Sequence, residues 1–214
     1  MKYRINIGKD TCEVGEVIKA VYDKDAAELK RLIQSGKSIH ENNRSGLSFF
    51  EWCINVNDLE IYKVAHEQGV ISSSSSEQVQ SAFLRSISRG DSSLWRWWLK
   101  EYPKQYVEYK WKLVAVATDS HEVEFLKMAL NDEVKFNINE KSGIGGETLL
   151  HIAADRLYYD VFEMLLNHGA DPTIKNVLGE DIRSFLATKS KLVPAQKRAK
   201  ASILKMIDSF ESEK

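Results

Sequence analysis

The sequence predicts an all-α solenoid of about six degenerate helix–turn–helix repeats, each roughly 33 residues long. The clearest repeat, residues 146–171, holds a turn of small residues, a short apolar helix, a break, a second apolar helix and a glycine. Segments of the same layout recur along the chain at intervals close to this length. Only three prolines occur, and the alternation typical of strands is scarce. A repeated helical hairpin therefore organises the chain.

The repeat at 146–171 provides the register for the others. Thr148 lies 21 residues before Gly169, and Ser48 lies 21 residues before Gly69. The expected starts of the six repeats are Gly15, Ser48, Ser81, Lys112, Thr148 and Asp181. Only Lys112 is out of step, by two or three residues. Because one helical hairpin cannot bury its apolar faces alone, the repeats should stack into a single domain spanning residues 1–214.

The two ends of this domain differ from the repeats. Residues 1–14 form a lead-in, within which residues 3–7 alternate briefly and are expected to be one short strand or an extended segment. Near the other end, Pro194 opens a long final helix, and residues 195–212 are expected to cap the stack.

The third and fourth repeats depart from the pattern. Ser74 and Glu77 have the spacing of a capping box, so the first helix of the third repeat should begin several residues early. Pro103 stands likewise at the expected start of the first helix of the fourth repeat. Both repeats should have a longer first helix and little of the extended turn, called a finger, that precedes a first helix elsewhere.

The stretch TLLHIAA, followed by VFEMLLNHGADP, resembles the ankyrin repeat, whose signature is Thr-Pro-Leu-His-x-Ala-Ala, a two-helix hairpin and a Gly-Ala-Asp exit. The proline of that signature is absent, since Leu149 stands in its place. The resemblance implies that Thr148 caps the first helix, that His151 bonds loop backbone and ties adjacent repeats together, and that Gly169 ends the second helix. It also implies protein binding through a concave face of fingers and first helices.

The contact positions usual in that family, carried over residue by residue, give the candidate partner-binding residues. They are Arg44, Leu47, Asn55, Arg89, Tyr109, Trp111, Asp119, Glu147, Asp155 and Arg156. Tyr106 joins Tyr109 on a stripe of the helix near Pro103, largely opposite a stripe that contains Val107 and Val114. We expect the tyrosine stripe to be an exposed hot spot for a protein partner. Packing within the stack and stacking on nucleic-acid bases are the alternatives.

Two other clusters have simpler interpretations. Four side chains of the run at 94–99 fall on core positions of the register: Leu94, Trp95, Trp98 and Leu99. Packing in the core is therefore expected, with Trp97 partly exposed. The lysine-rich stretch 189–205 is expected to be a solvated helix face, and a contact for an acidic partner is the alternative.

Composition and motifs disfavour several classes of function. The net charge is −1, from 30 basic and 31 acidic residues, so no overall field attracts nucleic acid or an anionic membrane. The two cysteines, Cys12 and Cys53, and the five histidines lack the spacing of metal ligands. No metal and no other cofactor is expected. No catalytic arrangement of residues is found, so we expect no enzyme activity and no small-molecule substrate.

The expected location and function follow. No stretch has the length of apolar sequence that crosses a membrane, and the N-terminus lacks the apolar core of a signal peptide. We expect a cytoplasmic protein that is a monomer when free. Its expected function is that of a non-catalytic adaptor or scaffold that binds a partner protein. The alternative is a single-domain inhibitor, such as an immunity protein that neutralises a toxin or an enzyme by binding it.

Overall fold

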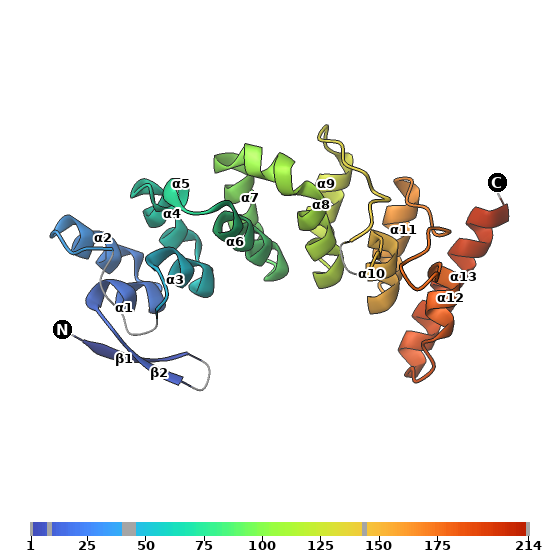
Figure 1. Cartoon of the computed structure of the whole chain (residues 1–214), viewed down its shortest axis with the longest axis horizontal. Helices are drawn as coiled ribbons and strands as arrows, with labels where there is room; N and C mark the ends of the chain where they lie inside the picture. The colour runs from blue at the N-terminus through green and yellow to red at the C-terminus, as the bar shows by residue number, and fades with distance from the viewer. Residues whose placement is uncertain (1, 8–9, 40–45, 143–144, 213–214) are drawn as a thin grey trace. The chain divides into compact units, whose positions relative to one another are not determined.

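The computed structural model describes residues 2–7, 10–39, 46–142 and 145–212. Paired helices dominate this part of the chain, which confirms the predicted all-α solenoid fold (Figure 1). The elements are β1 Tyr3–Ile7, β2 Asp10–Val14, α1 Glu16–Tyr22, α2 Ala26–Gln34, α3 Phe49–Val56, α4 Leu59–Glu67, α5 Val70–Ser73, α6 Ser76–Ser88, α7 Ser92–Glu101, α8 Pro103–Ser120, α9 Val123–Asn131, α10 Leu149–Arg156, α11 Tyr159–Asn167, α12 Ile182–Ala187 and α13 Pro194–Ser212.

The chain divides into two compact units. The N-terminal unit comprises residues 1–86 and 93–103, and the C-terminal unit comprises residues 87–92 and 104–214. Helix pairs make up both units. Those of the first are α1 with α2, α3 with α4, and α6 with α7; those of the second are α8 with α9, α10 with α11, and α12 with α13.

In the N-terminal unit, local caps define where the helices begin. Gly15 and Ser48 precede α1 and α3, which coincides with the starts that the repeat register predicts. The hydroxyl of Ser48 accepts a hydrogen bond from the backbone N–H of Glu51 at 3.2 Å, and the Glu51 carboxylate accepts one from the N–H of Ser48 at 2.6 Å. This reciprocal capping satisfies two amides that the helix itself leaves unpaired. Next, α1 packs on α3 and α2 on α4.

A β-hairpin precedes the first repeat. Its strands are antiparallel, with Tyr3 opposite Val14 and Ile5 opposite Cys12. The strand at 3–7 agrees with one of the two expectations for this stretch, whereas its pairing with residues 10–14 was not predicted. β1 contacts α1, and both Ile5 and Val14 are buried. The hairpin therefore covers apolar surface of α1 that would otherwise meet water.

An aromatic cluster forms the core between α4, α6 and α7. Leu94, Trp95 and Trp98 are fully buried, which confirms their prediction as core residues. The ring of Trp98 stacks on Phe83 at 5.8 Å between centroids and meets the edge of Tyr62 at 5.3 Å. As expected, Trp97 is partly exposed; Leu99 is partly exposed as well.

The two middle repeats have the long first helices that the sequence predicts. α6 has 13 residues and α8 has 18, compared with eight in α3 and in α10. The capping box of α6 is one residue later than predicted: Ser75 and Gln78 exchange hydrogen bonds of 3.2 and 3.3 Å. The short helix α5 stands where a finger would precede α6, and only Tyr102 separates α7 from α8. These repeats have therefore lost their fingers.

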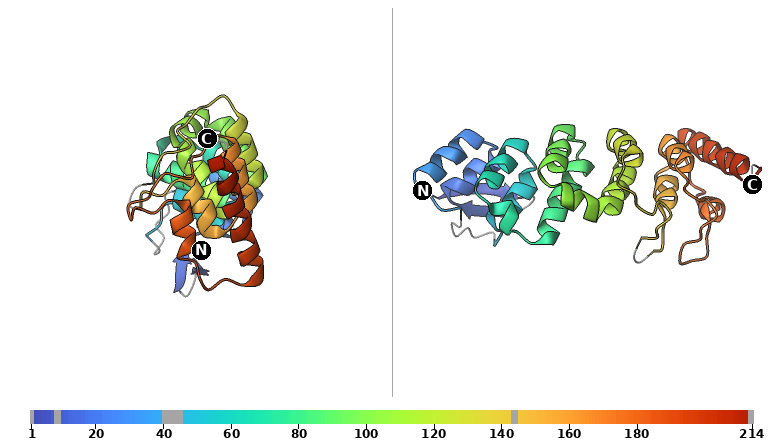
Figure 2. Two further views of the ribbon diagram at one scale, coloured as in Figure 1. Left: turned by 90° about the vertical axis from the view of Figure 1, so that its right-hand side faces the viewer. Right: turned by 90° about the horizontal axis from the view of Figure 1, so that it is seen from above.

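The C-terminal unit keeps two well-formed fingers. The first finger is residues 132–142 with 145–147, and the second finger is residues 171–180. Both extend to the same side of the unit (Figure 2). The backbone N–H of Val177 donates to the carbonyl of Gly145 at 3.1 Å, so the fingers are bonded to each other. Gly146 has φ +61°, and a Cβ there would lie 2.8 Å from the side chain of Val177, so this close approach needs glycine.

His151 ties α10 to the second finger. The backbone N–H of Thr148, the N-cap of α10, donates to its Nδ1 at 3.3 Å. Because Nδ1 accepts, Nε2 carries the ring proton and donates to the carbonyl of Glu180 at 3.1 Å. The ring is buried, and desolvation lowers the pKa of His151 below its ordinary value. The contact to loop backbone that the family resemblance implies is therefore present.

The predicted exposure of Tyr106 and Tyr109 is wrong. Both side chains are buried, at 7% and 6% exposure, whereas Val107, assigned to the packing stripe, is 58% exposed. Tyr106 meets the edge of the Phe125 ring of α9, with centroids 6.5 Å apart. Both apolar stripes of the long helix α8 are covered over most of its length, since Leu113 of one stripe and Val114 of the other are fully buried.

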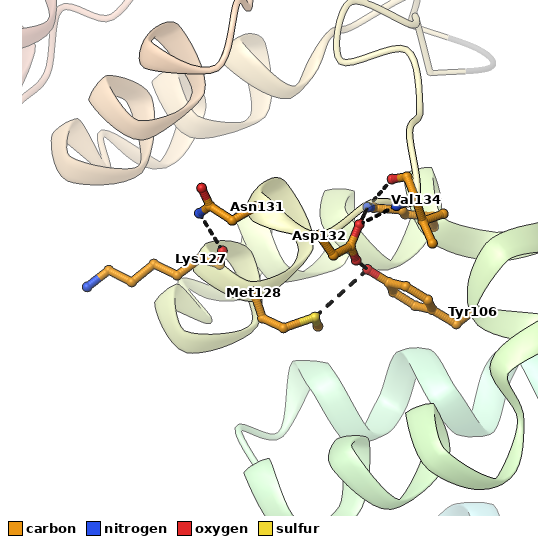
Figure 3. A network of polar contacts seen from close by, with 7 residues as sticks. Tyr106, Lys127, Met128, Asn131, Asp132 and Val134 are labelled. Atoms are coloured by element: carbon orange, nitrogen blue, oxygen red, sulfur yellow. Dashed lines mark hydrogen bonds and ion pairs between the residues drawn. The ribbon is translucent and has the colours of Figure 1, made fainter.

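A polar network accounts for part of this burial (Figure 3). The hydroxyl of Tyr106 donates to the carboxylate of Asp132, the first residue after α9. The ammonium group of Lys110 pairs with the same carboxylate and also donates to the carbonyl of Val134. The Lys110 side chain is only 2% exposed. Burial and the hydrogen bond to Asp132 raise the pKa of Tyr106. The network fixes the start of the first finger to α8.

Lys110 should matter for stability because its removal leaves a half-buried carboxylate without its counter-ion. We expect Lys110→Met to lower the free energy of unfolding by about 2–3 kcal/mol, measured by urea titration. The double variant Lys110→Met/Asp132→Asn should recover part of that loss. Lys127→Met, which changes an exposed lysine of α9, is the control and should cost less than about 0.5 kcal/mol. If Lys110→Met and Lys127→Met lowered the free energy of unfolding equally, a stabilising role of the buried pair would be contradicted.

The lowered pKa of His151 predicts a dependence of stability on pH. The unfolded chain binds a proton at this ring near pH ~6.5, and the folded chain does so only at lower pH. The stabilisation by the neutral His151 ring is therefore fully present above the pKa of the unfolded chain, and it is lost as the pH falls towards the lower pKa of the folded chain. The Tm difference between the wild type and His151→Gln should be largest near pH ~7.5 and shrink by pH ~5.5. A Tm difference that does not change with pH would refute the role given to His151.

Candidate partner-binding surface

The structure distributes the predicted contact residues over three environments. Five are exposed: Asn55, Arg89, Asp119, Asp155 and Arg156. Three are partly exposed: Leu47, Trp111 and Glu147. Tyr106 and Tyr109 are buried, as described above, and Arg44 lies outside the described residues. Most of the accessible members belong to the C-terminal unit, so the site is built most completely there.

Two ion pairs join the ends of the first helices in this unit. Asp119 of α8 accepts a hydrogen bond from the guanidinium of Arg156 in α10 at 2.6 Å. Asp155 of α10 pairs with the ammonium of Lys189, which follows α12, at 2.7 Å. The Asp119 carboxylate raises the pKa of Arg156, which stays charged at any physiological pH. Consecutive repeats are thus linked by a row of alternating charges.

The pair between Asp119 and Arg156 is open to solvent. The side chains of Asp119 and Arg156 are 51% and 50% exposed. An ion pair in such a position contributes little to folding, because water solvates each partner nearly as well. Both groups can therefore exchange their present contacts for charged groups of a partner at low cost.

The tip of the second finger carries two exposed apolar side chains. Val177 is 65% exposed and Leu178 is 78% exposed, the highest value among the large exposed apolar side chains of the described residues. The side-chain oxygen of Asn176 accepts hydrogen bonds from the N–H of Leu178 at 2.9 Å and from that of Glu180 at 3.0 Å. The turn is therefore held in one conformation, and its tip points two apolar groups into water.

The exposure of this apolar pair was not predicted from the sequence. The available signal was its composition, since turn tips usually carry Gly, Asn, Asp or Ser and here hold Val-Leu before Gly179. Exposed apolar residues at such a place are typical of binding surfaces.

The N-terminal unit contributes fewer of the predicted contacts. Asn55 lies near the end of α3, and its carbonyl accepts a hydrogen bond from the guanidinium of Arg85 in α6 at 3.4 Å. Leu47 immediately precedes the cap of α3 and is half-buried. Residues 40–45 lie outside the described residues.

Other site chemistries find no support in the described residues. Within the described ranges, no three His, Cys, Asp or Glu side chains come together in a way that could hold a metal ion. Among the helices that the structure describes, none combines the length and the apolar character that crossing a bilayer requires.

Comparison with known proteins agrees with this geometry. A family model of ankyrin repeats, in three copies, matches residues 83–176. No curated protein sequence matches the chain.

Solved structures extend the similarity over most of the chain. The ankyrin-repeat protein EF0377 is 21% identical, with a TM-score of 0.60 over 91% of this chain and 97% of its own. The ankyrin-repeat domain of Bcl-3, of the IkappaB family, is 17% identical, with a TM-score of 0.59 over 87% of this chain and 86% of its own.

A third similar structure is a complex. The structure is that of a predatory endopeptidase from Bdellovibrio bacteriovorus in complex with an immunity protein. One chain of this complex is 14% identical, with a TM-score of 0.61 over 90% of this chain and 98% of its own. At these identities the structures show the fold alone. The chain has the fold of ankyrin-repeat proteins, and its residues 83–176 match the ankyrin-repeat family.

Proposed function

We propose that this chain is a non-catalytic binding protein that holds a partner protein on one face of its C-terminal unit. Ankyrin repeats generally mediate protein–protein interaction, and their fold is typically a non-catalytic module. The proposed contact residues form what we call the finger surface: Asp119, Glu147, Asp155, Arg156, Val177 and Leu178. Arg89 and Trp111 of the same unit, and Leu47 and Asn55 of the other, stay predictions from the sequence.

The exposed tip of the second finger is the observation that carries this proposal. Burying a Val or Leu side chain contributes about 1.5–3 kcal/mol. The bonds from Asn176, and the bond between Val177 and Gly145, already hold the turn in place. Little conformational entropy is lost when such a tip enters a pocket of a partner, so most of the burial energy becomes affinity.

The charged row at the ends of α8 and α10 supplies orientation. Asp119, Asp155 and Arg156 present both signs within one row, so a partner must match their order to dock without leaving a charge unpaired. Such complementarity acts mainly on specificity and on the association rate. The apolar tip and the charged row therefore have separate roles in one surface.

An adaptor or scaffold in the cytoplasm, monomeric when free, is the role we propose. The second candidate is an inhibitor or immunity protein, which is favoured by the similarity to a chain from the endopeptidase–immunity protein complex. Affinity capture with the tagged chain from its native host, followed by mass spectrometry, separates the two roles. Recovery of one enzyme in equal amounts supports the inhibitor, and recovery of several unrelated proteins supports the adaptor.

The finger tip should dominate affinity for the captured partner. We expect Val177→Ser/Leu178→Ser to weaken binding at least tenfold, measured by isothermal titration calorimetry with the purified partner. Because both side chains are exposed, the Tm should change by less than about 2 °C.

Val107→Ser is the matched control for this test. Val107 is 58% exposed on α8, so the substitution removes the same kind of side chain away from the fingers. Its affinity should equal that of the wild type. The proposal fails if the finger variant binds as tightly as the wild type, or if the Val107 variant loses as much affinity.

The charged row should act on the association rate. Arg156→Glu places two carboxylates beside each other where Asp119 now meets a guanidinium. We expect a roughly tenfold slower association in surface plasmon resonance at low salt, with the difference shrinking as salt is added. Arg31→Glu is a control, since it reverses an exposed, ion-paired arginine on α2 of the N-terminal unit. An identical rate change in both variants would show that only net charge matters.

A further inference from the structure

Charge is divided unevenly along the chain. Residues 182–207 contain seven basic residues and no acidic residue. The rest of the chain therefore holds 23 of the 30 basic residues against all 31 acidic ones. The near-neutral total conceals a strongly basic C-terminal stretch on an otherwise acidic protein.

Four of these cations are exposed and unpaired. No ion pair joins them to any acidic side chain among the residues that the structure describes: Lys191, Lys197, Arg198 and Lys205. The other three have partners. Arg183 pairs with Asp208 and Glu211, Lys189 pairs with Asp155, and Lys200 donates to the carbonyl of Lys189 at 3.0 Å.

The unpaired cations on α13 share one side of the helix. Lys197 and Arg198 lie two turns before Lys205, and Ala201 stands between them with its small side chain exposed. Ile203 and Ile207 are buried on the other side, where α13 packs against α11 and α12. The positive end of the helix dipole adds to the charge near Lys197. We call this side, together with Lys191, the basic stripe.

Solubility alone does not require this arrangement. Other second helices keep their exposed faces in water with mixed charges: Glu60 and Lys63 form a pair on α4, and Glu28 and Arg31 form one on α2. The basic stripe has no such pairs, and its like charges repel one another, which opposes folding. The negative charge of an anionic partner would offset the repulsion between these cations.

We infer that the basic stripe of α13 docks an acidic segment of a protein partner. This inference rests on the proposed function, that the chain binds a protein, and it adds the chemistry of that protein. The stripe is short, and the remainder of the chain carries an excess of negative charge that repels an extended polyanion. A short acidic segment is complementary to the stripe and avoids that repulsion, whereas a nucleic acid or an anionic bilayer does not.

Helix α13 is linked to Asp155 of the finger surface through Lys189. Lys200 of α13 contacts Lys189, and Lys189 pairs with Asp155 of the finger surface at 2.7 Å. Val193, the residue immediately before α13, is 59% exposed and adds an apolar side chain two residues after Lys191.

The test uses the full chain and a fluorescently labelled oligo-glutamate peptide as the probe. Fluorescence anisotropy should show binding at low salt that weakens as salt is added. The variant Lys191→Gln/Lys197→Gln/Arg198→Gln/Lys205→Gln should bind at least roughly tenfold more weakly. Its Tm should equal or exceed that of the wild type, because like-charge repulsion is relieved.

A control variant removes the same charge elsewhere in the C-terminal unit: Lys104→Gln/Lys127→Gln/Lys141→Gln/Lys175→Gln, four exposed lysines. It should bind the peptide within about twofold of the wild type. Equal loss in both variants overturns the inference, because only net charge would then matter. Tighter binding of the wild type to single-stranded DNA or to phosphatidylserine vesicles than to the peptide also overturns it.

The native partner separates this inference from the proposed function. If the finger variant loses the captured partner while the basic-stripe variant retains full affinity, the basic stripe is not a docking site and the proposed function stands. If neither set of substitutions changes the affinity for any captured protein, the proposed function fails as well.

Discussion

A helical hairpin has apolar surface on more than one side, and each repeat of this chain depends on its neighbours to cover it. Within the N-terminal unit α1 packs on α3 and α2 on α4; within the C-terminal unit α10 packs on α12 and α11 on α13. Residues at the centre of these pairs, such as Leu29 and Val161, have no exposed surface. Nearest-neighbour packing therefore holds the fold together, and surfaces that face away from neighbours are free to carry function.

The same constraint explains why the middle repeats differ. α6 and α8 extend backwards over the positions that a finger occupies elsewhere, so they bury more helix and present less loop. In α8 this extension brings Tyr106 and Lys110 against the end of α9. There the carboxylate of Asp132 accepts a hydrogen bond from Tyr106 and pairs with the ammonium group of Lys110. The buried ion pair needs all of its partners, because a charge left alone in the interior is costly. The long helix α8, which no finger precedes, therefore holds the start of the following finger through Tyr106 and Lys110.

The sequence predicted the features that depend on local chemistry. Caps such as Ser48 with Glu51 need only residues close in the chain, so the positions of α1, α3, α10 and α12 could be read from spacing. Features that depend on tertiary packing could not be predicted. The burial of Tyr106 depends on its contacts with Phe125 and Asp132 beyond α8, and periodicity along α8 alone cannot predict them. The tip at Leu178 was missed because its exposure depends on the conformation of a loop.

The finger surface and the basic stripe of the C-terminal unit are proposed to act on different steps of binding. Apolar burial at Leu178 acts over contact distance and slows dissociation, whereas the cations of α13 act over about a Debye length and speed encounter. Lys189, 22% exposed, pairs with the 52% exposed carboxylate of Asp155. A partner carboxylate that displaces Asp155 from Lys189 would release Asp155 towards the finger surface. The charge presented at Asp155 therefore depends on whether a partner occupies Lys189.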